Sequence, residues 1–118
     1  MHRDPHDDMT AAEQLAQHSH HDAAEAFAAI ACDSAVDEEL RLSAAEQLAA
    51  ADPRAAAPAC LAIACDGAVG DEVRLSAAEL LATVDPRAAA PACLAIARDE
   101  GVSDGVRLSA AELLPTIP

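Results

Sequence analysis

The sequence predicts an all-α fold of about seven helices, in which antiparallel helix pairs stack into an α-solenoid. Alanine, which has the highest intrinsic helix propensity, occurs 33 times among the 118 residues. The four glycines fall outside the runs of alanine and leucine, as expected of short connectors between helices. A period of 33 residues also runs along the chain, and periods of this size are typical of helical repeats.

The period divides one domain, residues 1–118, into similar units. The stretch DPRAAAPACLAIA occurs twice at this step, and the phrase RLSAAE occurs three times. The stretch TAAEQLAQ, near the start of the chain, also nearly matches SAAEQLAA one period later. We therefore expect a half repeat at 5–18, followed by repeats at 19–51, 52–84 and 85–118.

Each repeat is expected to form two helices, preceded by one single helix near 5–18. In the second repeat, Asp52 is expected to cap the first helix and Pro53 to stand in its first turn. A short bend is expected before Pro58, because a proline inside a helix costs about 3 kcal/mol. The stretch CDGAVGD is expected to end this helix with its two glycines.

The second helix of the pair is expected to start at Asp71, because acidic side chains suit the positive end of the helix dipole. Apolar residues follow at a helical spacing. They are Val73, Ala77, Leu80, Leu81 and Val84. One helix pair cannot bury its apolar side alone, whereas stacked pairs can.

The charge of the chain limits its partners. The formal net charge is −14, with 21 acidic residues against seven arginines. Such a chain lacks the basic stripe that nucleic acid requires, and an anionic membrane would repel it, so the expected partner is a protein with a basic surface. The opening residues show no apolar segment of a signal peptide, and no apolar run is long enough to span a membrane. We expect a cytoplasmic protein.

Four cysteines are expected to be reduced and structural, since nothing indicates a secretory context. Cys60 and Cys93 are equivalent positions of successive repeats, as are Cys32 and Cys65. Stacked helices lie about 8–10 Å apart, which exceeds the reach of a disulfide. Phe27 takes the position of Cys60 in the first repeat, which favours a place in the core.

The histidines are the one feature that suggests a cofactor. His18, His20 and His21, with Asp22, are residue types that bind Zn²⁺ or Ni²⁺. The cluster is expected in a turn, however, and the later repeats have no histidine at matching positions. We expect an exposed polar loop and no cofactor, with a metal-binding helical protein as the alternative function.

Catalytic motifs are absent from the sequence. Ser43, Ser76 and Ser109 occur in one repeated frame without a nearby histidine, which predicts a packing position. The acidic runs at Asp37–Glu39 and Asp71–Glu72 fall at helix starts, where solvated acids are expected. There is no glycine-rich phosphate loop and no dinucleotide fingerprint. The chain is therefore not expected to be an enzyme.

The phrases DPRAAAPACLAIACD and DEVRLSAAELLA resemble the HEAT-like repeats of the phycobilisome-lyase type, over about residues 5–117. The resemblance implies a right-handed α-solenoid. It also implies a structural ladder, in which an aspartate after the first helix and an arginine in the second helix tie neighbouring repeats together. These residues would be Asp33, Asp66, Asp99, Arg41, Arg74 and Arg107. Asp8 stands where the half repeat would carry its arginine, so the ladder is expected to end there.

The function predicted from these features is that of a protein-binding module or adaptor. The second helices are expected to line one face, on which Glu46, Glu79 and Glu112, with Thr83 beside them, form the contact surface. An acidic inhibitor or immunity-type protein that blocks a basic active site is an alternative with the same fold.

The carboxyl-terminal stretch AELLPTIP is less polar than the amino-terminal one. Leu113, Leu114 and Ile117 are expected to be exposed. We therefore expect a homodimer through the last repeat.

Overall fold

The computed structural model describes Met9 and residues 20–114, with the side chains of Met9 and of residues 23–114. The residues 20–114 contain six α-helices and no strand, so the predicted all-α class is confirmed. The helices are α2 (His20–Ala31), α3 (Glu38–Ala51), α4 (Pro53–Ala64), α5 (Asp71–Val84), α6 (Pro86–Arg98) and α7 (Asp104–Leu113). The single helix expected near 5–18 lies outside the described residues, apart from Met9.

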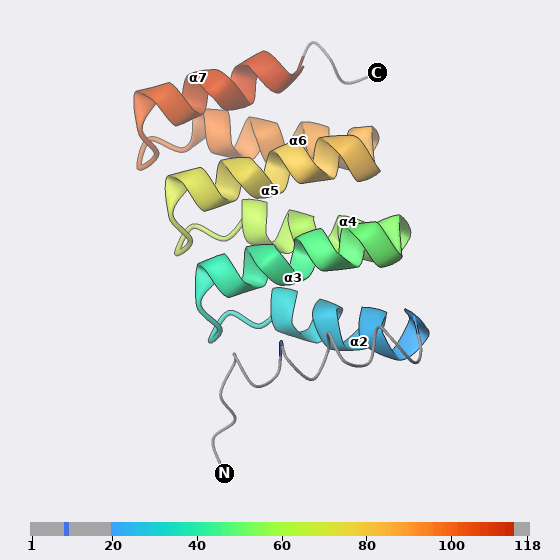
Figure 1. The fold of residues 1–118 in the computed structure, drawn as a ribbon. Helices are drawn as coiled ribbons and strands as arrows, with labels where there is room; N and C mark the ends of the chain where they lie inside the picture. The colour runs from blue at the N-terminus through green and yellow to red at the C-terminus, as the bar shows by residue number, and fades with distance from the viewer. Residues whose placement is uncertain (1–8, 10–19, 115–118) are drawn as a thin grey trace.

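The helices follow one another in a row (Figure 1). Each helix packs against the next helix in the chain and against the one after it. The second helices of the three sequence repeats are α3, α5 and α7, and they lie side by side on one side of the row. The first helices, α2, α4 and α6, lie on the other side, so equivalent residues of successive repeats are neighbours.

The first helices α4 and α6 begin with the same pair of residues. Asp52 Oδ1 accepts a hydrogen bond from the Ala55 N–H at 3.4 Å, and Pro53 is the first residue of α4. Asp85 caps α6 in the same way. The Ala55 and Ala88 N–H groups also donate to the main-chain carbonyls of Asp52 and Asp85 at 3.1 Å, so each aspartate binds the first turn of its helix through both its side chain and its backbone. The predicted start of this helix at Asp52 and Pro53 is confirmed.

Pro58 lies inside α4, which runs unbroken from Pro53 to Ala64, so the predicted bend before Pro58 is wrong. Proline removes the hydrogen bond that its own nitrogen would donate to the carbonyl four residues earlier. Here this carbonyl belongs to Arg54, an exposed residue in the first turn of the helix, where water can take the place of the missing donor. Pro91 occupies the same position in α6.

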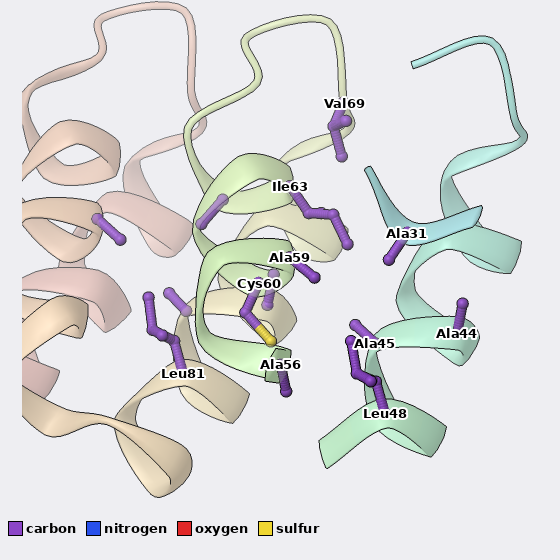
Figure 2. Close-up of a cluster of buried hydrophobic side chains, with 14 of the residues drawn as sticks. Ala31, Ala44, Ala45, Leu48, Ala56, Ala59, Cys60, Ile63, Val69 and Leu81 are labelled. Atoms are coloured by element: carbon purple, nitrogen blue, oxygen red, sulfur yellow. The ribbon is translucent and has the colours of Figure 1, made fainter. Parts of the chain in front are cut away.

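Small side chains form most of the core. The largest fully buried side chains are those of Phe27, Leu48, Ile63, Leu81, Ile96, Cys60 and Cys93. Figure 2 shows Cys60 and Ile63 of α4 between the helix that carries Leu48 and the helix that carries Leu81. Alanines fill the space around them, and because alanine is short the helix backbones can approach closely.

The loops between the paired helices all contain the same turn. The main-chain carbonyl of Asp66 accepts a hydrogen bond from the Val69 N–H at 3.1 Å, and Asp66 Oδ1 accepts one from the Ala68 N–H at 3.0 Å. The same bonds recur at Asp33 and Asp99. None of the glycines has a positive φ angle, and all four lie in the described range. The predicted role of glycine in ending α4 is therefore wrong, because the aspartate and the buried Val69 fix the turn.

Candidate partner-binding face

The three glutamates predicted to bind a partner lie on the same side of the molecule. Glu46 on α3, Glu79 on α5 and Glu112 on α7 are all exposed. They occupy equivalent positions on the second helices, which lie side by side (Figure 1). Because α5 packs against both α3 and α7, the three carboxylates form one row. Among the described residues, none of the three makes an ion pair or a hydrogen bond through its side chain.

Two further glutamates extend this row. Glu39 lies seven residues before Glu46, and Glu72 lies seven residues before Glu79, a spacing that places each pair on one side of its helix. Both are exposed. Their position at helix starts predicts only solvated caps, whereas their seven-residue spacing from Glu46 and Glu79 is the sequence signal that places them in this row. We call Glu39, Glu46, Glu72, Glu79 and Glu112 the acidic face.

The exposed arginines are separated from the acidic face. Arg54 on α4 and both Arg87 and Arg98 on α6 are exposed, and all three belong to first helices. The arginines of α3 and α5 are buried instead. Because no exposed base neutralises the acidic face on α3 or α5, this side of the described chain presents a concentrated negative charge.

A groove of about 450 Å³ crosses the acidic face between α5 and α7. It is lined by Glu72, Leu75, Ser76, Glu79, Ser103, Gly105, Val106 and Ser109. Gly105 stands where the earlier repeats carry Glu39 and Glu72, and a Cβ atom there would meet nothing within 4 Å. The missing side chain leaves the groove open at its α7 edge.

The repeated serines do not form the predicted packing position. Ser43 is exposed, and Ser76 and Ser109 are half-buried in the wall of the groove. The second helices place them on the outer side, one turn from the acidic row, because serine and glutamate are three residues apart in the phrase LSAAE.

Thr83 is exposed beside Glu79, four residues further along α5. Its Oγ1 donates a hydrogen bond to the Leu80 carbonyl at 2.7 Å. Threonine hydroxyls in helices commonly bond back to their own backbone in this way. The hydroxyl proton of Thr83 is therefore already used within the helix.

Two of the three ladder arginines join neighbouring repeats. Arg41 Nη1 lies 3.0 Å from Asp66 Oδ2, and Arg41 Nε donates to the Ala31 carbonyl at 3.0 Å. Arg74 makes the same contacts, at 2.8 Å to Asp99 and at 2.9 Å to the Ala64 carbonyl. Only 3% of Arg41 and 4% of Arg74 is exposed, so these arginines are structural and are not available to a partner.

The ladder is incomplete at both ends of the described chain. Asp33 is exposed, and its carboxylate accepts only the Ala35 N–H, at 2.9 Å. At the other end, Arg107 Nε donates to the Ala97 carbonyl at 2.9 Å, but the nearest carboxylate is that of Asp104, at 3.9 Å on the same helix. Asp8, where the ladder was expected to end, lies outside the described residues.

The ladder contacts alter the acidity of their aspartates. The Ala68 N–H and then the Arg41 guanidinium hold the pKa of Asp66 below its ordinary value. For Asp99, the hydrogen bond from Arg74 is the larger cause of the lowered pKa, and the Gly101 N–H adds to it. Both aspartates therefore stay ionised in mildly acidic solution.

A second set of contacts between repeats involves acidic residues at helix starts. Glu38 Oε2 accepts a hydrogen bond from the Gly70 N–H at 2.7 Å, and Asp71 Oδ2 accepts one from the Ser103 N–H at 2.7 Å. The prediction that these acids are only solvated caps is therefore wrong for Glu38 and Asp71. Each instead binds the residue before the second helix of the next repeat, a contact that no local pattern reveals.

The four cysteines are free, as predicted, but only two lie in the core. Cys60 and Cys93 are buried, whereas Cys32 and Cys65 are exposed. Burial raises the pKa of the Cys60 thiol to about 11, and burial also raises the pKa of Cys93. Neither buried thiol is suited to act as a nucleophile.

The histidine cluster falls outside what can be described at side-chain level. His18 lies outside the described residues, and His20, His21 and Asp22 are described only as backbone at the start of α2. Elsewhere, among the described side chains, no group of three or more histidine, cysteine or acidic residues is arranged to hold a metal ion.

In the described part of the chain, no helix is both long enough and apolar enough to cross a membrane. The chain matches no protein-family model, no curated protein and no solved structure.

Proposed function

We propose that this chain is a non-enzymatic protein-binding module, built as a short right-handed α-solenoid of HEAT-like helix pairs. It binds a basic surface of a partner protein on the acidic face formed by α3, α5 and α7. The observation that carries the proposal is the separation of charge, with five exposed glutamates on the second helices and the exposed arginines on α4 and α6.

The acidic face suits an extended basic contact better than a single small ligand. Its carboxylates are spread over three helices, and the groove between α5 and α7 is open to solvent. Leu75 and Val106 provide apolar surface at the groove for the stem of a lysine or arginine, while Glu72 and Glu79 take the charged end. Repeat proteins commonly use such extended surfaces for binding.

Isosteric substitution tests the proposal without reversing the charge. The triple variant Glu46→Gln, Glu79→Gln, Glu112→Gln removes three negative charges from the acidic face. The matched control Ala62→Arg, Ala95→Arg, Glu100→Gln changes the net charge by the same amount at exposed positions away from the acidic face. Both variants should unfold at the same temperature as the wild type, since surface substitutions change stability little.

The wild type and both variants are used to capture proteins from an extract of the source cells. A protein bound by the wild type and the control but lost by the triple glutamine variant is expected, and its association should slow as salt is added. Equal capture by all three proteins would contradict binding through the acidic face.

A further inference from the structure

Four residues on each second helix face the following repeat, at the spacing i, i+3, i+4 and i+7. On α5 these are Asp71, Arg74, Leu75 and Ala78. Asp71 binds the Ser103 N–H, Arg74 binds Asp99, and Ala78 is completely buried. This set of positions is therefore a stacking surface, and α3 has the same contacts at its equivalent residues.

The same four positions on α7 are Asp104, Arg107, Leu108 and Ala111. Among the described helices, α7 packs only against α5 and α6, and no helix covers these four positions from the other side. We call them the α7 stripe. The Asp104 side chain is fully exposed, and Arg107 is 34% exposed at its side chain. Leu108 is 61% exposed and is the one large hydrophobic residue exposed among the described residues. The predicted exposure of Leu113 and Leu114 is wrong, because both are half-buried against the core, and Ile117 lies outside the described residues.

The opposite end of the row offers only part of a matching surface. Ala23, Phe27 and Ile30 of α2 are all buried, so these apolar side chains are not open to a second copy. Asp33, whose equivalents Asp66 and Asp99 bind the ladder arginines, is exposed, so the Asp33 loop of a second copy is one surface that the α7 stripe could meet. The other is the α7 stripe of the second copy.

We propose that two copies of the chain bind each other through their α7 stripes, related by a two-fold axis. A two-fold contact requires a surface that is complementary to itself. The α7 stripe meets this requirement because it carries one acidic side chain, Asp104, and one basic side chain, Arg107. Arg107 of each copy meets Asp104 of the other, around a central contact between the two Leu108 side chains. Arg107 Nε donates to the Ala97 carbonyl, and Arg107 Nη1 lies 3.9 Å from Asp104 Oδ1 of its own helix, an ion pair too long for a hydrogen bond. The Nη atoms therefore have hydrogen bonds left to donate to a second copy. This inference is independent of the acidic face and its partner.

Sedimentation velocity over a concentration series up to about 1 mM tests the dimer, since a small interface of this kind is expected to be weak. The wild type should rise from its monomer mass of 12.0 kDa toward twice that value. The variant Leu108→Glu should weaken association by more than about tenfold. The control Ala95→Glu adds the same charge at an exposed position of α6 and should associate as the wild type does.

A charge exchange identifies which surfaces meet. The variant Asp104→Arg should remain monomeric, because it places two arginines opposite each other, and its fold should be intact since the Asp104 side chain is fully exposed. The double variant Asp104→Arg, Arg107→Asp should dimerise again, because the exchanged charges still complement each other across a two-fold axis. The melting temperature of each variant shows that it is folded.

Three results would overturn the proposal. The first is a mass of 12.0 kDa at all concentrations. The second is association that Leu108→Glu does not weaken. The third is a folded double variant that stays monomeric, which would mean that α7 meets a different surface, such as the Asp33 loop of another copy. A mass above that of a dimer would also contradict the two-fold contact, because it would indicate a head-to-tail contact between the α7 stripe of one copy and the Asp33 loop of the next.

Discussion

Arg74 and Asp99 are 25 residues apart in the chain, and their side chains meet at 2.8 Å. The same guanidinium donates to the carbonyl of Ala64, the last residue of α4. One side chain thus joins the end of a first helix to the loop of the following repeat. Arg41 makes the equivalent contacts one repeat earlier, so the stacking of repeats depends on a few buried polar groups as well as on apolar packing.

Replacing Arg74 with alanine should lower the free energy of unfolding by about 2 kcal/mol, because the buried Ala64 carbonyl loses its donor. Urea unfolding followed by circular dichroism measures this change. Arg107→Ala should have a smaller effect, about 1 kcal/mol, since Arg107 is partly exposed and binds only the Ala97 carbonyl well.

The control for both is Arg87→Ala, which removes the same charge from an exposed position and should change stability by less than about 0.5 kcal/mol. Equal effects at Arg74 and Arg87 would show that the ladder does not stabilise the fold.

The stability of the chain should fall in acid through Asp66 and Asp99. Both have a pKa lowered in the folded state by hydrogen bonds from backbone N–H groups and from Arg41 or Arg74. A lowered pKa contributes stability above the unfolded value of about 4, and this contribution is lost as the pH falls through the folded pKa. Unfolding by urea should therefore become easier below about pH 4.

Other acidic residues repel one another and oppose this trend, so the test is a comparison. The variant Asp66→Asn, Asp99→Asn should be less stable than the wild type at neutral pH, and the difference should shrink below about pH 4. A difference that stays constant with pH would contradict the predicted role of the two carboxylates.

The hydrogen bond from the Gly70 N–H to the Glu38 carboxylate should depend on the residue type at both positions. A Cβ atom on Gly70 would lie 2.9 Å from Glu38 Oε1, so Gly70→Ser should displace the glutamate and weaken its hydrogen bond. The equivalent contact in the next repeat combines the shorter Asp71 with Ser103. The double variant Glu38→Asp, Gly70→Ser should therefore recover about 0.5–1 kcal/mol of the stability that Gly70→Ser loses.

A double-mutant cycle in urea measures this coupling. Additive effects of the two substitutions would mean that the side chains at these positions do not depend on each other.

The cysteines should differ sharply in reactivity. Cys32 and Cys65 are exposed, whereas Cys60 is buried with a pKa raised to about 11. Iodoacetamide at mildly alkaline pH should label the two exposed thiols in the folded chain and reach Cys60 and Cys93 only after denaturant is added. Mass spectrometry of the digested protein locates the label. Rapid labelling of Cys93 without denaturant would show that the core opens readily.

Local sequence signals predicted much of the fold. Asp52 and Pro53 marked a helix start correctly, because capping acts within one turn of the chain. Pro58 was misread, since the cost of a proline depends on whether water can reach the freed carbonyl, and this is a property of the packed helix. The glycines of CDGAVGD were also misread, because the turn is held by a buried valine that only the stacked repeats can bury.

The candidate site was predictable to the extent that it follows the repeat. The row of Glu46, Glu79 and Glu112 follows directly from the 33-residue step. The hydrogen bond from the Gly70 N–H to Glu38 spans 32 residues, and the exposure of Leu108 depends on which elements pack beside α7, so neither has a local signature. The groove beside Gly105 likewise requires α5 and α7 to be placed against each other.

The contacts of Arg74 suggest how a chain of this kind changes length. Each ladder contact uses an arginine and a backbone carbonyl from one 33-residue unit and an aspartate from the next unit. Both units from residue 52 onward carry all three groups. A duplicated copy of residues 52–84, inserted after residue 84, would bring its own arginine for Asp99 and its own aspartate for the existing Arg74. Genetic duplication or deletion of one such block therefore preserves every contact between units, and the length of the acidic face can vary in whole units without redesign of the core.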